Sequence, residues 1–142
     1  METSKLIRGF MVSMMLLLAS CGSDQETSIA LEETNWELME LTVLGGFIFV
    51  PDEPGNYRIN FRSNSRLTGI SDCNNLNGRW LQEGSSLVFE GLDAKWMMCP
   101  PGSLHNNFVL YLRQVSSLMM EDGNLVLTTP TEGVKLAFRP AQ

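Results

Sequence analysis

The chain has 142 residues, with 16 acidic and 10 basic side chains and a formal net charge of −6. An acidic chain binds nucleic acid poorly, because neutralisation of phosphates by Lys and Arg dominates that affinity, so we expect no nucleic-acid partner. The length suits a short leader followed by one domain.

The first twenty residues differ from all that follow. Lys5 and Arg8 form a short positive region, and residues 10–19 are almost wholly apolar. This run is too short for a membrane-spanning helix, which needs about 20 apolar residues. It has the length of the apolar region of a secretory signal peptide, so residues 1–20 are predicted to be a signal peptide.

The leader ends in Leu18, Ala19, Ser20 and Cys21, a run that resembles the lipobox of bacterial lipoproteins. Small residues before the cleavage point fit a peptidase groove, and the Cys21 thiol would take a diacylglyceryl group by a thioether bond. We therefore expect Cys21 to become the lipidated N-terminus. The alternative is an ordinary signal peptide that happens to precede a Cys.

Residue 22 is Gly, where many lipoproteins retained at the inner membrane carry Asp. The expected location is therefore the cell envelope, lipid-anchored, at the outer membrane. Residues 21–33 are polar and predict a flexible tether, and residues 34–140 form the predicted domain. No second apolar stretch approaches spanning length, so the expected membrane contact is the N-terminal lipid anchor.

Short β-like runs dominate the predicted domain. Residues 57–62 alternate cleanly, with Tyr57, Ile59 and Phe61 on one face. Turn residues separate the runs, with Asn77 and Gly78 as a predicted hairpin turn. So many closely spaced strands predict an antiparallel sheet or small barrel. The other expected strands are residues 36–42, 47–50, 66–70, 79–82, 86–90, 125–128 and 134–138.

One segment has helical spacing instead. Ser103 follows Pro100, Pro101 and Gly102 and can cap a helix that ends near Ser116. The apolar face of this helix is expected to pack on the concave face of the sheet. Its apolar residues are Leu104, Phe108, Tyr111, Leu112 and Val115.

Residues 72–80, Asp-Cys-Asn-Asn-Leu-Asn-Gly-Arg-Trp, resemble the META domain, also called the HslJ-like domain. Residues 34–38 resemble the opening strand of that family, and residues 95–100, with Met-Met-Cys-Pro, resemble its second characteristic stretch. The resemblance runs from about Thr34 to Arg139. The motif positions that it carries over are Trp36, Cys73, Asn74, Gly78, Met98, Cys99 and Pro100.

The resemblance implies an α+β fold, mostly β: an antiparallel, incompletely closed β-barrel with one amphipathic helix filling the gap. Members are typically small envelope proteins, some of them heat-inducible or tied to antibiotic tolerance, which suggests a stress-related role. This chain departs from the family at Asp72, where Gly is usual, and it lacks the usual acidic start of the helix after Pro100.

The Asn-rich motif also has a direct physical interpretation. Asn74 and Asn75 readily bond to nearby backbone, and Asn77 with Gly78 suits positive φ. These properties predict a tight turn braced by side chains. A polar binding loop is the functional alternative.

Cys73 and Cys99 remain once Cys21 carries lipid. An even pair in an exported domain suggests a disulfide, because the cell envelope is oxidising. Such a bridge would stabilise the fold by roughly 3 kcal/mol. The alternative is two buried free thiols that act as small apolar side chains.

Two reactive sites can be imagined near the second motif. Met97, Met98, Cys99 and His105 carry ligand types suited to Cu(I). Adjacent Met residues in an extended strand point to opposite faces, so we predict no metal and no cofactor. Cys99 and His105 could form a thiol hydrolase, but a disulfide would remove its nucleophile. Without any other catalytic motif, the chain is predicted not to be an enzyme.

The leading hypothesis is a non-enzymatic envelope lipoprotein that binds another envelope component or an apolar ligand, or acts as a stress-related module through its surface. One version is an acyl-chain carrier whose chain enters the open side of the barrel. Its candidate lining is Trp80, Trp96, Phe108 and Leu112, which are alternatively core residues.

Overall fold

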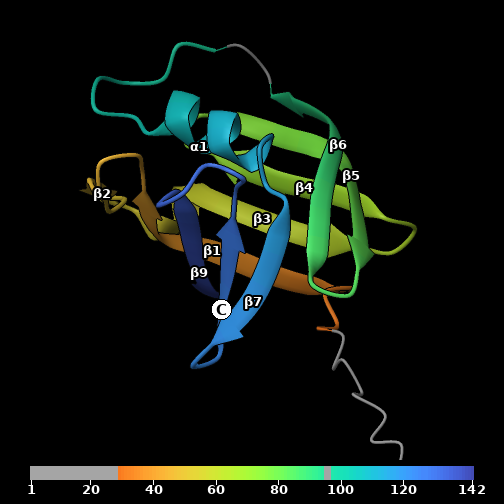
Figure 1. The fold of residues 1–142 in the computed structure, drawn as a ribbon. Coiled ribbons are helices and arrows are strands. Elements are labelled where there is room, and N and C mark those ends of the chain that lie inside the picture. Colours follow the sequence, from red (N-terminus) through yellow and green to blue (C-terminus); the bar gives the residue numbers. More distant parts are fainter. Residues whose placement is uncertain (1–28, 95–96) are drawn as a thin grey trace, which may run out of the picture.

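The computed structural model describes residues 29–94 and 97–142. The predicted signal peptide, Cys21 and Trp96 lie outside these described residues. Strands form one antiparallel sheet in the order β2-β1-β3-β4-β5-β6-β7-β8-β9, and β1 also pairs with β9, which closes a barrel (Figure 1). The strands are β1 (Thr34–Thr42), β2 (Ile48–Phe49), β3 (Tyr57–Arg62), β4 (Arg66–Ser71), β5 (Asn74–Glu83), β6 (Ser86–Ala94), β7 (Ser117–Glu121), β8 (Asn124–Thr128) and β9 (Lys135–Pro140).

The barrel is weakly joined between β6 and β7. These strands share the single pair Ser86 and Ser117. The chain leaves β6 at Ala94 and returns as β7 after the helix α1 (His105–Leu112), which lies beside this opening (Figure 1). The Arg113 guanidinium donates to the carbonyl of Leu92 at 3.2 Å. The predicted fold class, a mostly β, incompletely closed barrel with one helix, is confirmed.

Alternation of buried and half-buried residues builds the core. In β3 the buried residues are Tyr57, Ile59 and Phe61, as their spacing predicts. The helix completes the interior with Phe108 and Leu112, both 0% exposed. The rings of Tyr57 and Phe108 meet edge to face with centroids 5.5 Å apart. Helix and sheet therefore share one core.

The hairpin turn predicted at Asn77 and Gly78 is wrong. Strand β5 runs through both residues, and the register against β6 shifts between Asn77 and Arg79. A Cβ at Gly78 would meet the Glu90 carbonyl oxygen at 3.1 Å. Gly78 therefore permits close approach of two strands at a bulge. Bulges and close backbone contacts commonly require Gly within a strand.

The helix and the strand after it also differ from expectation. The helix ends at Leu112 and not near Ser116, and residues 117–121 form the unpredicted β7. Leu118 is the one buried residue of β7, so the strand lacks a regular apolar pattern. The N-cap position is Leu104, although Ser103 Oγ still accepts from the His105 N–H at 3.1 Å.

Packing of the chain begins before the predicted domain boundary. Leu31 is 1% exposed, and its carbonyl accepts from the Thr34 N–H at 3.1 Å. The Gln82 amide donates to the Ile29 carbonyl at 2.9 Å. Residues 29–33 therefore belong to the domain. The predicted tether, residues 21–33, extends too far at its C-terminal end.

Because the strands alternate in direction, the barrel has two distinct ends. The proximal end receives the chain at Ile29 and carries the β3–β4, β5–β6 and β7–β8 hairpins. The distal end carries the β1–β2 hairpin, the β4–β5 turn and residues 97–104. Figure 1 shows β2 and the segment before α1 on the left, away from the orange start of β1. No helix in residues 29–94 or 97–142 has the length and apolar character to cross a membrane.

Candidate functional site

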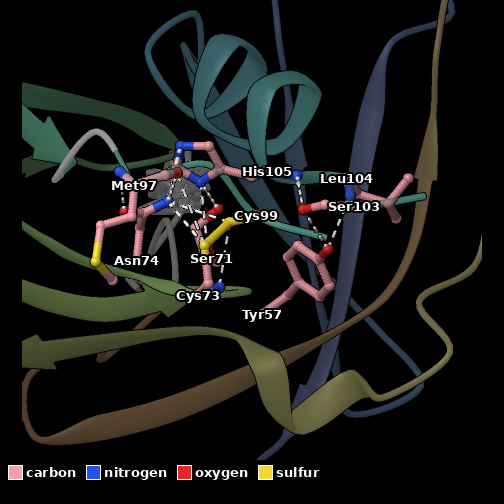
Figure 2. The surroundings of a disulfide bond; sticks show 9 residues. All are labelled: Tyr57, Ser71, Cys73, Asn74, Met97, Cys99, Ser103, Leu104 and His105. Carbon is pink, nitrogen blue, oxygen red and sulfur yellow. Dashed lines mark hydrogen bonds between the residues drawn. A yellow bond between two sulfur atoms is a disulfide. The ribbon is translucent and has the colours of Figure 1, made fainter. Parts of the chain in front are cut away.

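A disulfide joins two segments at the distal end. Cys73, in the β4–β5 turn, is bonded to Cys99, in the segment before α1, with 5.4 Å between their Cα atoms (Figure 2). The Cys73 N–H also lies 3.4 Å from Cys99 Sγ. Three polar residues surround this bond. We call the group, Ser71, Cys73, Asn74, Cys99 and His105, the disulfide corner.

Asn74 starts β5 and its side chain is 1% exposed. Its Oδ1 accepts from the Met97 N–H at 2.9 Å, and its Nδ2 donates to the Met97 carbonyl at 3.1 Å. Nδ2 also lies 3.2 Å from Cys99 Sγ. The Met97 N–H needs an acceptor, which the amide offers only at Oδ1, so this contact sets the orientation of the amide.

His105, at the start of α1, is buried against the same corner. Its Nδ1 lies 2.7 Å from Ser71 Oγ and 3.2 Å from the Ser71 carbonyl, while its Nε2 lies 3.4 Å from Asn74 Nδ2 (Figure 2). Since Nδ2 carries hydrogens, Nε2 is the acceptor, and the network assigns the ring proton to Nδ1. Both ring nitrogens are therefore engaged.

Tyr57 holds the other end of the segment. Its hydroxyl oxygen accepts from the Leu104 N–H at 2.8 Å and lies 3.4 Å from Ser103 Oγ. Leu104 is the N-cap position and has no side-chain oxygen, so Tyr57 supplies a hydrogen-bond partner for the helix start. Residues 97–104 are consequently fixed at both ends, by Asn74 with the disulfide and by Tyr57.

This arrangement bears on the two reactive sites considered from the sequence. Cys99 is oxidised, which leaves the thiol hydrolase without its nucleophile. Of the ligand types considered for Cu(I), Cys99 is in the disulfide and both ring nitrogens of His105 have partners within the protein, whereas Met97 and Met98 are 56% and 100% exposed. Within residues 29–94 and 97–142, no group of three or more His, Cys, Asp or Glu side chains could hold a metal.

The acyl-carrier lining is likewise placed by the structure. Phe108 and Leu112 are completely buried in the core. Trp80 packs edge to face on Phe61, with ring centroids 5.5 Å apart, and donates to the Arg62 carbonyl at 3.1 Å. These side chains occupy the space that an acyl chain would need in the interior of the barrel.

The remaining motif residues are spread over the molecule. Trp36 lies in β1 at the proximal end, 7% exposed, with its Nε1 donating to Thr34 Oγ1 at 2.7 Å. Gly78 lies at the β5–β6 bulge, whereas Met98 and Pro100 are exposed. Only Cys73, Asn74 and Cys99 come together as one site.

Asp72 has a φ of 56°, in the left-handed region that Gly adopts most easily. It is the first residue of the two-residue turn between Ser71, the last residue of β4, and Asn74, the first residue of β5, which pair with each other. The position explains why Gly would suit the turn. Asp is among the residues that tolerate this conformation, so the departure leaves the turn intact.

Residues 29–142 match the model of the META domain family, a range that includes every residue that the structure describes. The chain belongs to the META domain family. Among curated proteins, none matches it. The resemblance inferred from the Asp72–Trp80 run is therefore confirmed, and the disulfide corner is the place where its two motif segments meet.

Several solved structures share the fold of this META domain. An NMR structure of a protein from Burkholderia xenovorans has 20% identity and a TM-score of 0.66, covering 79% of this chain and 84% of that chain. A second NMR structure has 22% identity and a TM-score of 0.56, covering 77% and 90%. A crystal structure of a DUF4847 family protein from Bacteroides vulgatus has 14% identity and a TM-score of 0.56, covering 77% and 93%.

The sequence interpretation missed a feature beside the disulfide corner. Residues 100–104 form one wall of a groove of about 370 Å³ whose other wall includes residues from Phe49 to Asn56. The β1–β2 hairpin next to it exposes large apolar side chains. The available signal was the run 43–51, which is apolar yet does not alternate as a half-buried strand would.

Proposed function

We propose that this META domain protein is a non-enzymatic binding module of the bacterial cell envelope, lipid-anchored through Cys21 at the outer membrane. The observation that carries the proposal is the disulfide between Cys73 and Cys99. Disulfides persist in the periplasm and at cell surfaces but are rare in the cytosol, where thiols are kept reduced. The apolar leader, residues 10–19, would direct the export of the chain to such a compartment.

The lipid anchor follows from the residues around Cys21. The run Leu18-Ala19-Ser20-Cys21 has the small residues and the thiol that lipoprotein processing requires. A single acyl chain holds a protein only weakly at a bilayer, whereas two or more give stable attachment. The stress-related role that the family resemblance suggests would then be exercised at the membrane surface.

Binding is favoured over catalysis by how the polar groups of the distal end are used. The Asn74 amide, the His105 ring and the Cys99 sulfur are all engaged within the protein. Groups held in this way shape and stiffen a surface, and stiff surfaces lose less conformational entropy when a partner binds. The corner thus supports a recognition surface.

Metabolic labelling with radioactive palmitate tests the anchor. We expect label in the wild-type chain and in the Cys73→Ala variant, which is the matched control, but none in Cys21→Ala. Separation of inner and outer membranes on a density gradient then reports the location. Label retained by Cys21→Ala, or recovery of the wild-type chain in the cytosol, would overturn the proposal.

A further inference from the structure

We propose that the distal groove between the β1–β2 hairpin and residues 100–104 docks a basic, partly apolar segment of another envelope protein. The inference rests on the proposed binding function and names its partner class. Its starting point is the apolar hairpin, defined by four side chains that are 58% to 69% exposed: Leu44, Phe47, Ile48 and Val50.

The apolar hairpin is held in place by the backbone. The Val43 N–H donates to the Phe47 carbonyl at 2.9 Å, and the Gly46 N–H donates to the Val43 carbonyl at 3.0 Å. Strand β2 pairs with β1 through Phe49 opposite Leu41 and Ile48 opposite Thr42. Phe49 packs partly buried against the core, whereas Ile48 is exposed. A contiguous exposed apolar patch on an otherwise well-packed protein marks an interaction site.

The groove beside this hairpin is acidic. Asp52, Glu53 and Asp72 line it, and its described lining residues include no Lys or Arg. Within residues 29–94 and 97–142, the two ion pairs use other carboxylates, those of Glu33 and Glu37. These three carboxylates are therefore available to a cationic ligand.

The walls of the groove are stiff. Pro51 lies on the hairpin side, and Pro100 and Pro101 lie on the opposite side. Proline fixes φ, and the disulfide at Cys99 ties the second wall to the β4–β5 turn. A groove that is already formed pays little ordering entropy when a partner enters it.

Charge and position together select a protein segment as the occupant. Carboxylates attract Lys and Arg side chains but repel anionic lipid headgroups and the same groove on a second copy. The chain enters the barrel at Ile29, at the proximal end, so the distal groove faces away from the side of the tether. A segment with basic residues among apolar ones would satisfy both the groove and the apolar hairpin.

The test uses the full chain in phosphatidylcholine nanodiscs and a fluorescent peptide of alternating lysine and leucine, with empty nanodiscs as the blank. We expect Phe47→Ser with Val50→Ser, and separately Asp52→Asn with Glu53→Gln, to raise the Kd at least about tenfold. Peptides with glutamate for lysine, or serine for leucine, should not bind.

Matched controls lie on the β7–β8 hairpin at the proximal end. Met119 and Met120 are 44% and 40% exposed, and Glu121 and Asp122 are exposed carboxylates. Met119→Ser with Met120→Ser, and Glu121→Gln with Asp122→Asn, should leave the Kd within about twofold. Equal Kd values for distal variants and wild type, or equal losses in distal and control variants, would overturn the proposal.

Hydrogen–deuterium exchange distinguishes the other occupants. The peptide should protect residues 44–53 and 100–104 from exchange. Protection of residues 44–50 by the nanodisc alone, relative to detergent, would make the bilayer the occupant. Protection that grows with protein concentration would make it a second copy, and either result overturns a protein-segment site. Palmitate labelling measures lipidation of Cys21 independently of peptide binding. Failure of the proposed lipid anchor is therefore distinguishable from failure of the proposed docking groove.

Discussion

The side-chain amide of Asn74 pairs with the backbone of Met97 as a strand partner would, accepting at 2.9 Å and donating at 3.1 Å. The two residues are 23 positions apart, and the adjacent disulfide joins the same two segments. This pairing holds the segment that leads into residues 100–104, which line the distal groove. The stability of the fold and the shape of the groove therefore depend on the same contacts.

Replacing Asn74 by Ala removes both bonds and leaves the Met97 groups without their partner. Loss of hydrogen bonds at a buried site costs about 2 to 3 kcal/mol in the free energy of unfolding. Urea denaturation followed by tryptophan fluorescence measures it. Asn75→Ala is the control, because Asn75 is exposed on the same strand; equal midpoints for the two variants would contradict this role.

Removing the disulfide with Cys73→Ser and Cys99→Ser should lower the free energy of unfolding by about 3 kcal/mol, because the bridge closes a long loop of the unfolded chain. The measurement is the urea midpoint of the oxidised chain against the double variant. Thiol-directed labelling of the denatured wild-type chain should modify Cys73 and Cys99 only after reduction. Labelling of either residue without a reductant would argue against the bridge.

Gly69 lies where β3 and β4 approach closely, since a Cβ there would overlap the carbonyl oxygen of Arg58. Gly69→Ala should therefore destabilise the protein by about 3 kcal/mol, as overpacking forces the backbone to shift. Gly133→Ala is the comparison: its φ is 80° but nothing lies near its Cβ, so about 1 kcal/mol is expected from strain alone. Similar thermal midpoints for the two variants would contradict the close approach.

Asp72 has two roles, since it adopts positive φ in the β4–β5 turn and lines the distal groove. Two substitutions separate these roles. Asp72→Gly should raise the free energy of unfolding by up to about 1 kcal/mol, because Gly adopts positive φ without strain. Asp72→Asn keeps a residue that tolerates this conformation and removes the charge. Both variants should bind the lysine–leucine peptide more weakly than wild type, whereas stability should change only for Asp72→Gly.

Tyr57→Phe keeps the ring against Phe108 and removes the hydroxyl oxygen that accepts from the Leu104 N–H. A lost helix-capping partner costs about 1 kcal/mol. Urea denaturation gives the stability, and amide exchange should be faster at Leu104 and His105 than in wild type. Unchanged exchange at the start of α1 would mean that water replaces the hydroxyl without loss.

The sequence by itself determined the features that depend on neighbouring residues. Alternation from Tyr57 to Arg62 predicts β3 with its bounds, since burial of one face requires a period of two. The ordered motifs around Cys73 and Cys99 were enough to recognise the META domain family. The predicted barrel with one helix followed from that resemblance.

Only the tertiary structure decided the features that depend on distant partners. Asn77 and Gly78 have the chemistry of a turn, yet β5 continues through them because β4 and β6 pair with it on both sides. The turn falls instead at Asp72, where the register of β4 with β5 requires it. The contacts of His105 with Ser71 and of Asn74 with Met97 arise from the same long-range pairing, which local residue patterns do not encode.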